Sequence, residues 1–133
     1  MTVPFNPARG LIRVRAEITG PAGNVFTVLA LDTGASVTLI SPVRLAQAGY
    51  DPSAVGVPVK TTTAGGVVQA FRLPVASLAA LERSRTHFPV LAYALPSTAS
   101  VDGLLGLDFV RGHVLTLDFV KGEITLTPGA PTP

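Results

Sequence analysis

The N-terminal part of the chain alternates apolar and polar side chains. Residues 12–18 place Ile, Val, Ala and Ile at every second position, with Arg, Arg and Glu between them. This two-residue period is typical of a β-strand with one face in the core and the other in water. A turn-forming segment follows at 19–24, and an apolar run rich in β-branched residues covers 25–31. We therefore expect a β-hairpin within the first thirty residues.

The remaining chain shows similar strand patterns around one helix. Ser41 supplies an N-cap, Pro42 suits the first helical position and Gly49 suits the C-terminal end, so a helix of about two turns is expected from Pro42 to the closing Gly49. A shorter helix or turn is expected at 107–110. Further strands are expected at 57–63, 67–73, 75–81, 87–93, 114–119 and 123–126. Many short strands with one or two short helices predict an all-β fold, a closed barrel or a sandwich.

Composition limits the size and class of the protein. A chain of 133 residues is long enough for one domain. Gly and Pro number 13 and 12, and charged residues make up only 14%, which is unfavourable for a coiled coil or a helical bundle. Hydrophobic residues reach 47%, yet no apolar stretch approaches the roughly 18 residues that a membrane span needs. The apolar side chains are therefore expected in a core or on a partner surface.

Charge and cysteine usage exclude further classes. The net charge is +2, and the ten basic residues are spread along the chain without a cluster, so we expect no nucleic-acid partner. There is no cysteine, which excludes disulfides and cysteine chemistry. The first residues lack the pattern of a secretory signal, and a cytoplasmic location is expected. Neither histidine has the spacing of a metal site.

The strongest chemical signal is an acid that directly follows an apolar strand. Asp32 comes after the run 25–31 and is followed by Thr33, Gly34 and Ala35 and then by a second apolar run. Asp-Thr-Gly by itself also forms an ordinary Asx turn. The dense apolar residues on both sides favour instead a carboxylate held at the edge of a buried sheet.

Two further elements follow this acid in a fixed order. A hairpin tip with paired glycines comes first, and an apolar-apolar-Gly sequence comes about seventy residues after the acid; their residues are Ala64, Gly65 and Gly66, and Leu104, Leu105 and Gly106. Together with the residues 30–35, these elements resemble the retropepsin-like aspartic proteases, in particular their single-domain bacterial and cellular members. The resemblance implies a protease domain over 11–127, after an N-terminal segment 1–10. The Pro-rich tail 128–133 is expected to be disordered.

The resemblance implies an aspartic endopeptidase that is active as a symmetric homodimer. This route of peptide hydrolysis needs two carboxylates that share one proton, and the chain carries a single Asp-Thr-Gly. The second carboxylate must then be Asp32 of another chain. In the resemblance, Thr33 locks the two loops across the two-fold axis and Gly34 lets the backbone approach the carboxylates. The resemblance also implies that the tip 64–66 is a flap over an extended polypeptide substrate and that the strand 104–106 packs beneath the catalytic loop. No metal and no organic cofactor is implied.

Two kinds of alternative remain open from the sequence. The protein could be a retropepsin-like homodimer that binds peptides or only dimerises, with weak or no proteolysis, although a binding module has no need of a desolvated acid pair. Among the other acids, Asp102 is predicted to be a turn residue rather than a second catalytic acid. Asp108 is predicted to cap the start of the helix 107–110 rather than to act in catalysis.

Overall fold

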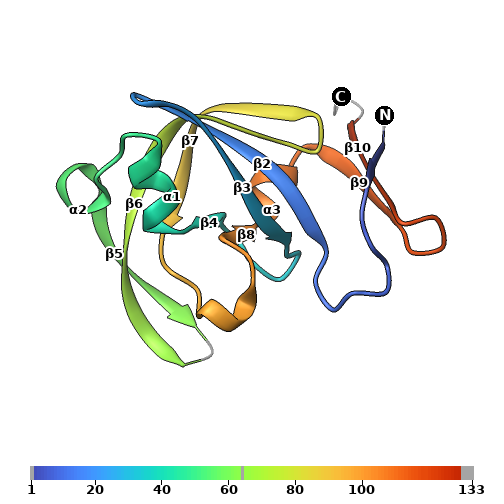
Figure 1. Ribbon diagram of the computed structural model, residues 1–133, viewed down its shortest axis with the longest axis horizontal. Coiled ribbons are helices and arrows are strands. Elements are labelled where there is room, and N and C mark those ends of the chain that lie inside the picture. Colours follow the sequence, from blue (N-terminus) through green and yellow to red (C-terminus); the bar gives the residue numbers. More distant parts are fainter. Residues whose placement is uncertain (1, 64, 130–133) are drawn as a thin grey trace.

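The computed structural model describes residues 2–63 and 65–129. Its strands and helices are, in chain order, β1 (Thr2–Pro4), β2 (Arg13–Gly20), β3 (Gly23–Leu31), β4 (Leu39–Ile40), α1 (Pro42–Gln47), α2 (Pro52–Val55), β5 (Val57–Thr63), β6 (Gly66–Ala80), β7 (Arg83–Ala92), the 3-10 turn η1 (Ser97–Ala99), β8 (Gly103–Leu105), α3 (Leu107–Val110), β9 (His113–Asp118) and β10 (Glu123–Pro128). Figure 1 shows their arrangement.

Six strands form a closed β-barrel. The larger sheet has the strand order β2-β3-β8-β4-β7-β6-β5. Strand β2 also pairs with the far end of β6, with Ala16 opposite Ala80 and Thr19 opposite Ser77, and this pairing joins the two ends of the sheet. Strand β5 lies outside the closed part, as one arm of a hairpin with β6. The prediction of an all-β barrel with few short helices is confirmed.

The barrel interior takes the apolar face of the alternating strands. In β2, Val14, Ala16 and Ile18 are buried, whereas Arg15 is exposed, as the two-residue period predicts. Burial of each large side chain stabilises the fold by about 1.5–3 kcal/mol relative to its exposure. Other fully buried side chains of the interior are Leu29, Ile40, Leu73, Val75, Leu78, Leu105 and Phe109.

Tyr50 stabilises the closure of the barrel, where β2 pairs with β6. Its hydroxyl donates to the main-chain oxygen of Thr19 over 2.9 Å and accepts the Ala76 N–H over 2.8 Å. Thr19 belongs to β2 and Ala76 to β6, so one side chain links both strands of the closure. The adjacent Gly20 has no room for a side chain, because the main chain of Ala48 and the Tyr50 ring lie against it.

Strand β6 is one strand of 15 residues, although the sequence predicts two runs separated by Pro74. Pro74 lies opposite Pro89 of β7, and neither residue has an N–H to donate. On its other side, β6 pairs with β5 up to Arg72 and with β2 from Ser77 onward. Pro74 therefore falls in the gap between two partner strands, where no ladder hydrogen bond is lost.

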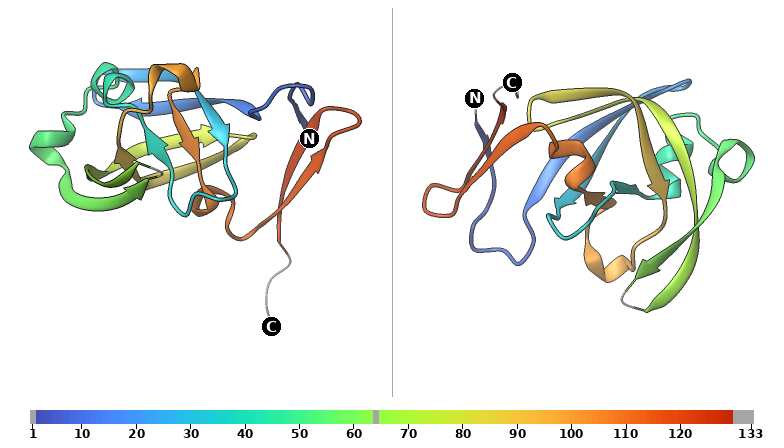
Figure 2. Two further views of the ribbon diagram at one scale, coloured as in Figure 1. Left: turned by 90° about the horizontal axis from the view of Figure 1, so that it is seen from below. Right: turned by 180° about the vertical axis from the view of Figure 1, so that it is seen from behind.

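A second sheet stands beside the barrel. It has three strands in the order β1-β10-β9, and Figure 2 shows it set off to one side of the barrel. The N-terminal strand was not predicted; Val3 pairs there with Ile124. Strand β10 extends to Pro128, and the Gly129 N–H donates to the Gly112 main-chain oxygen over 2.9 Å. The rest of the predicted tail, 130–133, lies outside the described residues.

The helices are short. Helix α1 begins as predicted, with Pro42 in its first turn and the Ser41 hydroxyl accepting the Val43 N–H over 3.3 Å. Helix α2 was not predicted; it follows Asp51 and begins with Pro52. No helix within residues 2–63 and 65–129 is long and apolar enough to cross a membrane.

Candidate active site

Asp32 is the first residue after β3, and a core strand fixes its main chain. Leu31 pairs with Leu105 of the parallel neighbour β8, and the Asp32 N–H donates to the Leu105 main-chain oxygen over 3.0 Å. Leu105 is fully buried. Because the supporting strand lies in the core, the half-buried Asp32 is held firmly at the end of the barrel.

The loop that follows folds back onto the Asp32 carboxylate. The Gly34 N–H donates to Oδ1 over 2.9 Å, and the Ala35 N–H donates to the Asp32 main-chain oxygen over 3.1 Å. This is the Asx turn that the tripeptide alone predicts, formed at the end of a buried strand. Within the described part of the chain, nothing hydrogen-bonds to Oδ2. That oxygen can therefore exchange a proton with water or a substrate.

The tip of this loop is exposed. Thr33 and Gly34 both face solvent, and the Thr33 hydroxyl has no hydrogen-bond partner in residues 2–63 and 65–129. A Cβ on Gly34 would lie 3.2 Å from Oδ1 of Asp32, which is tighter than an ordinary contact. Glycine thus leaves the carboxylate uncrowded from this side.

Strand β8 passes between the two ends of the catalytic loop, residues 32–38. It pairs with β3 on one side and with β4 on the other, with Leu104 opposite Leu39. A Cβ on Gly106 would come within 2.7 Å of the Val37 main-chain carbonyl, so this position requires glycine because the two backbones touch. The structure thus brings the apolar-apolar-Gly sequence directly beneath the Asp32 loop.

Asp108 and Thr38 hold the same loop, in a way that the sequence did not reveal. The Asp108 carboxylate accepts the Thr38 N–H over 2.9 Å and the Thr38 hydroxyl over 2.7 Å. The Thr38 hydroxyl in turn accepts the Gly106 N–H over 3.1 Å. The predicted helix cap at Asp108 is wrong: the N-cap position is Gly106, without a side-chain hydrogen bond. The one sequence feature that could have pointed to this contact is Thr38, a single polar residue between apolar neighbours.

Asp102 lies away from the Asp32 loop, at the other end of β8. Its Oδ2 accepts the Thr27 hydroxyl over 2.9 Å and the Val28 N–H over 3.1 Å, and Arg44 Nε lies 3.4 Å away. Burial alone raises the pKa of Asp102, but the hydrogen bonds from Val28 and Thr27 and the Arg44 charge outweigh it, so its pKa lies below the ordinary value. Asp102 ties β3 and α1 to the start of β8.

The predicted flap is a hairpin of β5 and β6. Thr61 lies opposite Val68 and Thr63 opposite Gly66. The Thr63 hydroxyl accepts the Gly65 N–H over 3.2 Å and donates to the Gly66 main-chain oxygen over 3.0 Å. Ala64 lies outside the described residues. In Figure 1 the tip of this hairpin and the loop after β3 lie at the same, lower end of the barrel.

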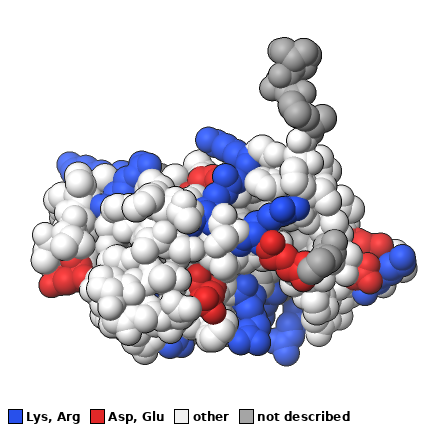
Figure 3. Space-filling view, turned by 90° about the horizontal axis from the view of Figure 1, so that it is seen from above, with Lys and Arg blue, Asp and Glu red and all other residues white. Residues whose placement is uncertain are grey.

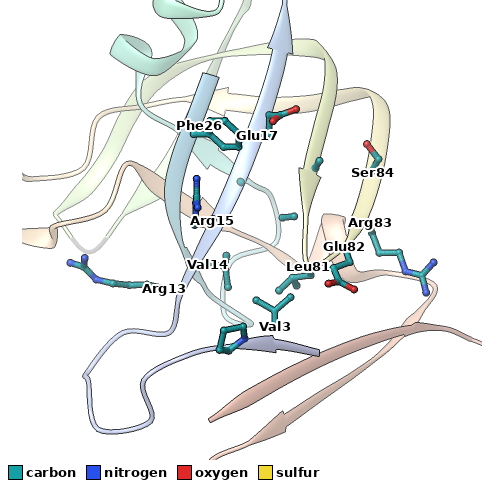
Figure 4. Close-up of a pocket in the computed structure, with 14 residues that line it drawn as sticks. Val3, Arg13, Val14, Arg15, Glu17, Phe26, Leu81, Glu82, Arg83 and Ser84 are labelled. Carbon is teal, nitrogen blue, oxygen red and sulfur yellow. The ribbon is translucent and has the colours of Figure 1, made fainter. Parts of the chain in front are cut away.

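Two of the cavities in the described part of the chain bear on the candidate site and its surroundings. One of about 540 Å³ lies between β2 and the β6–β7 turn, near Val3 of the terminal sheet, and is drawn in Figure 4. No residue of the loop 32–38 lines it. A smaller cavity of about 190 Å³ is lined by the β5–β6 hairpin, β7 and Val37 of the catalytic loop. The smaller cavity therefore adjoins the candidate site.

A closed β-barrel with one Asp-Thr-Gly loop above an apolar-apolar-Gly strand defines a single-domain retropepsin-like fold. The sequence profile of the family described as aspartyl protease matches residues 14–109, so the chain belongs to the aspartyl protease family. A crystal structure of a retropepsin-like aspartic protease from Rickettsia conorii is similar, with a TM-score of 0.67 and 19% sequence identity over 98% of this chain and 92% of that chain. A comparison with curated proteins gave no match. The resemblance stated from the sequence is confirmed.

Proposed function

We propose that this protein is an aspartic endopeptidase that cleaves extended polypeptides with two Asp32 carboxylates, one from each subunit of a homodimer. The observation that carries the proposal is the single Asp-Thr-Gly loop, in which Asp32 is half-buried and has one oxygen, Oδ2, without a partner in the described part of the chain. A lone carboxylate can take up or release one proton, whereas this hydrolysis needs an acid and a base together.

The chemistry follows from two carboxylates that share one proton. Like charges at such short range do not both ionise, so one acid stays protonated while the other is ionised. The ionised carboxylate takes a proton from a water molecule as its oxygen attacks the scissile carbonyl carbon. The protonated carboxylate donates to the carbonyl oxygen. Collapse of the tetrahedral intermediate breaks the C–N bond as the leaving amine takes the proton that the first carboxyl gained from water, and the intermediate returns a hydroxyl proton to the second carboxylate.

The exposed tip of the catalytic loop supports a second copy as the partner. Thr33 follows Asp32 directly and is exposed, so a two-fold axis beside it can bring two such loops together. A symmetric contact presents the same surface from both subunits, and each Thr33 hydroxyl can then bond to the opposite loop. The substrate lies extended between this loop and the β5–β6 hairpin, where edge strands offer main-chain hydrogen bonds.

Cleavage of an unfolded protein by wild type and by Asp32→Asn tests the proposal. We expect Asp32→Asn to lower the cleavage rate by about 10²–10⁴-fold, because one general acid–base group of the pair is lost. Asp51→Asn is the matched control, since it removes an exposed carboxylate at the start of α2 and has the same effect on net charge. Equal rates for wild type and Asp32→Asn would exclude the assigned chemistry.

Mixing experiments test whether the pair spans two subunits. Wild type is allowed to exchange with excess Asp32→Asn protein, and exchange is verified with two differently tagged chains. At about ninefold excess, random exchange leaves roughly one wild-type chain in ten paired with another wild-type chain, so activity per wild-type chain falls about tenfold. Activity that simply follows the amount of wild-type chain, after exchange has been shown, means that the pair is not shared between subunits.

A further inference from the structure

The cavity of about 190 Å³ joins the β5–β6 hairpin to the catalytic loop. Val59 and Thr61 contribute the hairpin wall, and Val37, from the loop that carries Asp32, contributes another wall. The remaining apolar wall includes Val90 and Leu91 of β7. A substrate that runs between the hairpin and the loop passes along this cavity, which has room for a side chain.

Arg72 is the charged side chain on the cavity face of the hairpin. It lies opposite Val57 of β5 and Leu91 of β7 in the antiparallel ladders. Opposite residues share a face of the sheet, and so do alternate residues along a strand. Arg72 is therefore on the same face as Val59, and it is exposed. Lys60 also borders the cavity, but it follows Val59 directly and so lies on the other face of the hairpin.

Neither cation has an anionic partner in the described part of the chain. The sequence contains no Asp or Glu between Asp51 and Glu82. Within residues 2–63 and 65–129, one side-chain ion pair is formed, and it joins Arg44 to Asp102. In the same residues, neither Arg72 nor Lys60 makes a side-chain hydrogen bond. By contrast, Lys and Arg are interspersed with Asp and Glu on the face shown in Figure 3. The hairpin thus carries a local positive charge that no acidic side chain of the described residues neutralises.

We propose that this cavity is a substrate subsite that selects an acidic side chain, Asp or Glu, and that Arg72 determines this specificity. The proposal rests on the proposed protease function. A guanidinium binds a carboxylate through two parallel hydrogen bonds, which a neutral amide does not match. The apolar walls from Val37, Val59 and Leu91 take the methylene groups of the ligand and keep part of the water away, which strengthens the charge interaction.

Peptides that differ at one position test the proposal. A peptide library is screened both for cleavage by wild type and for binding to Asp32→Asn, and either screen identifies the peptide position at which an acidic side chain has the largest effect. Versions with Glu, Gln and Lys there are then compared by kcat/KM. For wild type we expect Glu to exceed Gln by about three- to tenfold, and Lys to be the poorest, because the ion pair is only partly shielded from water. Higher salt concentration should reduce the difference.

Variants of Arg72 identify the residue responsible. Arg72→Gln should abolish the preference for Glu over Gln, and Arg72→Glu should reverse it so that the Lys peptide becomes the best substrate. Arg83→Glu is the matched control: it makes the same change of charge at the β6–β7 turn, on the other cavity, and should keep the Glu preference. Because Arg72 is exposed and Arg83 makes no side-chain hydrogen bond or ion pair within residues 2–63 and 65–129, urea unfolding should give similar stabilities for all three variants.

The outcomes separate this proposal from the proposed function. Affinities of the same peptides for Asp32→Asn are measured by fluorescence anisotropy, which needs no hydrolysis. Tighter binding of the Glu peptide that depends on Arg72 supports the subsite, even if no peptide is cleaved and the protease function fails. Cleavage or binding without preference for the acidic peptide overturns the subsite while leaving the protease function intact. A Glu preference that persists in Arg72→Glu overturns the role of Arg72.

Discussion

The carboxylate of Asp108 accepts both hydrogen-bond donors of Thr38, the main-chain N–H over 2.9 Å and the hydroxyl over 2.7 Å, across a sequence separation of 70 residues. Thr38 ends the catalytic loop, and Asp108 lies in the first turn of α3. The two hydrogen bonds therefore join the loop that carries Asp32 to the helix that follows β8. Since Thr38 is fully buried, its end of the pair is shielded from competing water.

Thr38→Val removes the hydroxyl but keeps the shape of the side chain. The Asp108 carboxylate then loses one donor and the buried Gly106 N–H loses its acceptor. We expect the free energy of unfolding to fall by about 1–3 kcal/mol, as for a lost hydrogen bond to a charged group. Urea unfolding measures the change. Thr116→Val, an exposed threonine of β9, is the control, and an equal loss in both variants would contradict the role of Thr38.

Gly106→Ala tests the close approach of β8 to the catalytic loop. The added methyl would come within 2.7 Å of the Val37 main-chain carbonyl and 2.9 Å of the Ala35 main-chain oxygen, so the loop must move. Overpacking of this kind costs about 1–3 kcal/mol, and we expect both stability and cleavage rate to fall. Gly10→Ala is the control, because nothing lies within 4 Å of its Cβ. Wild-type stability and activity in Gly106→Ala would show that the contact is dispensable.

Local patterns predicted most of the strands and the loop at the end of β3. The alternation in β2 depends only on neighbouring residues, and burial of Val14, Ala16 and Ile18 agrees with it. The order of the Asp-Thr-Gly, glycine-tip and apolar-apolar-Gly elements was sufficient to identify the family. These features are visible in sequence because each is set by residues a few positions apart.

The features that sequence did not reveal depend on long-range pairing. Pro74 continues a strand only because it falls between the segments of β6 that pair with β5 and with β2. The three-residue strand at Val3 exists because Ile124 lies beside it. Likewise, nothing local to Asp108 indicates that its partner is Thr38. Such relationships are fixed by the topology of the barrel rather than by periodicity.

Asp102 is expected to make stability depend on pH in the acidic range. Its pKa is lowered in the folded protein, so its contribution is fully present above the unfolded pKa of about 3.9 and is lost as pH falls through the lower, folded pKa. Asp102→Asn should therefore be less stable than wild type at pH 6, with the difference shrinking below about pH 4. Urea unfolding at several pH values measures it, with Asp51→Asn as the charge control. A difference that does not change with pH would refute this linkage.

The hairpin tip at Gly66 should matter for turnover more than for stability, if the β5–β6 hairpin is the flap of the proposed protease. Gly66 has φ +118°, and an alanine there meets no atom within 4 Å, so the substitution introduces backbone strain alone. Gly23, at the tip of the β2–β3 hairpin, has φ +121° and is equally uncrowded, which makes Gly23→Ala a closely matched control.

Both alanine variants should lose similar stability, about 1–3 kcal/mol for a residue forced into this backbone region. We expect only Gly66→Ala to lower kcat/KM, because a strained tip changes how the hairpin closes over substrate, while Gly23 lies on a different hairpin. Urea unfolding and peptide cleavage are measured on the same preparations, with sedimentation to show that the oligomeric state is unchanged. Equal kcat/KM values in the two variants, at equal stability, would mean that the β5–β6 tip takes no part in catalysis.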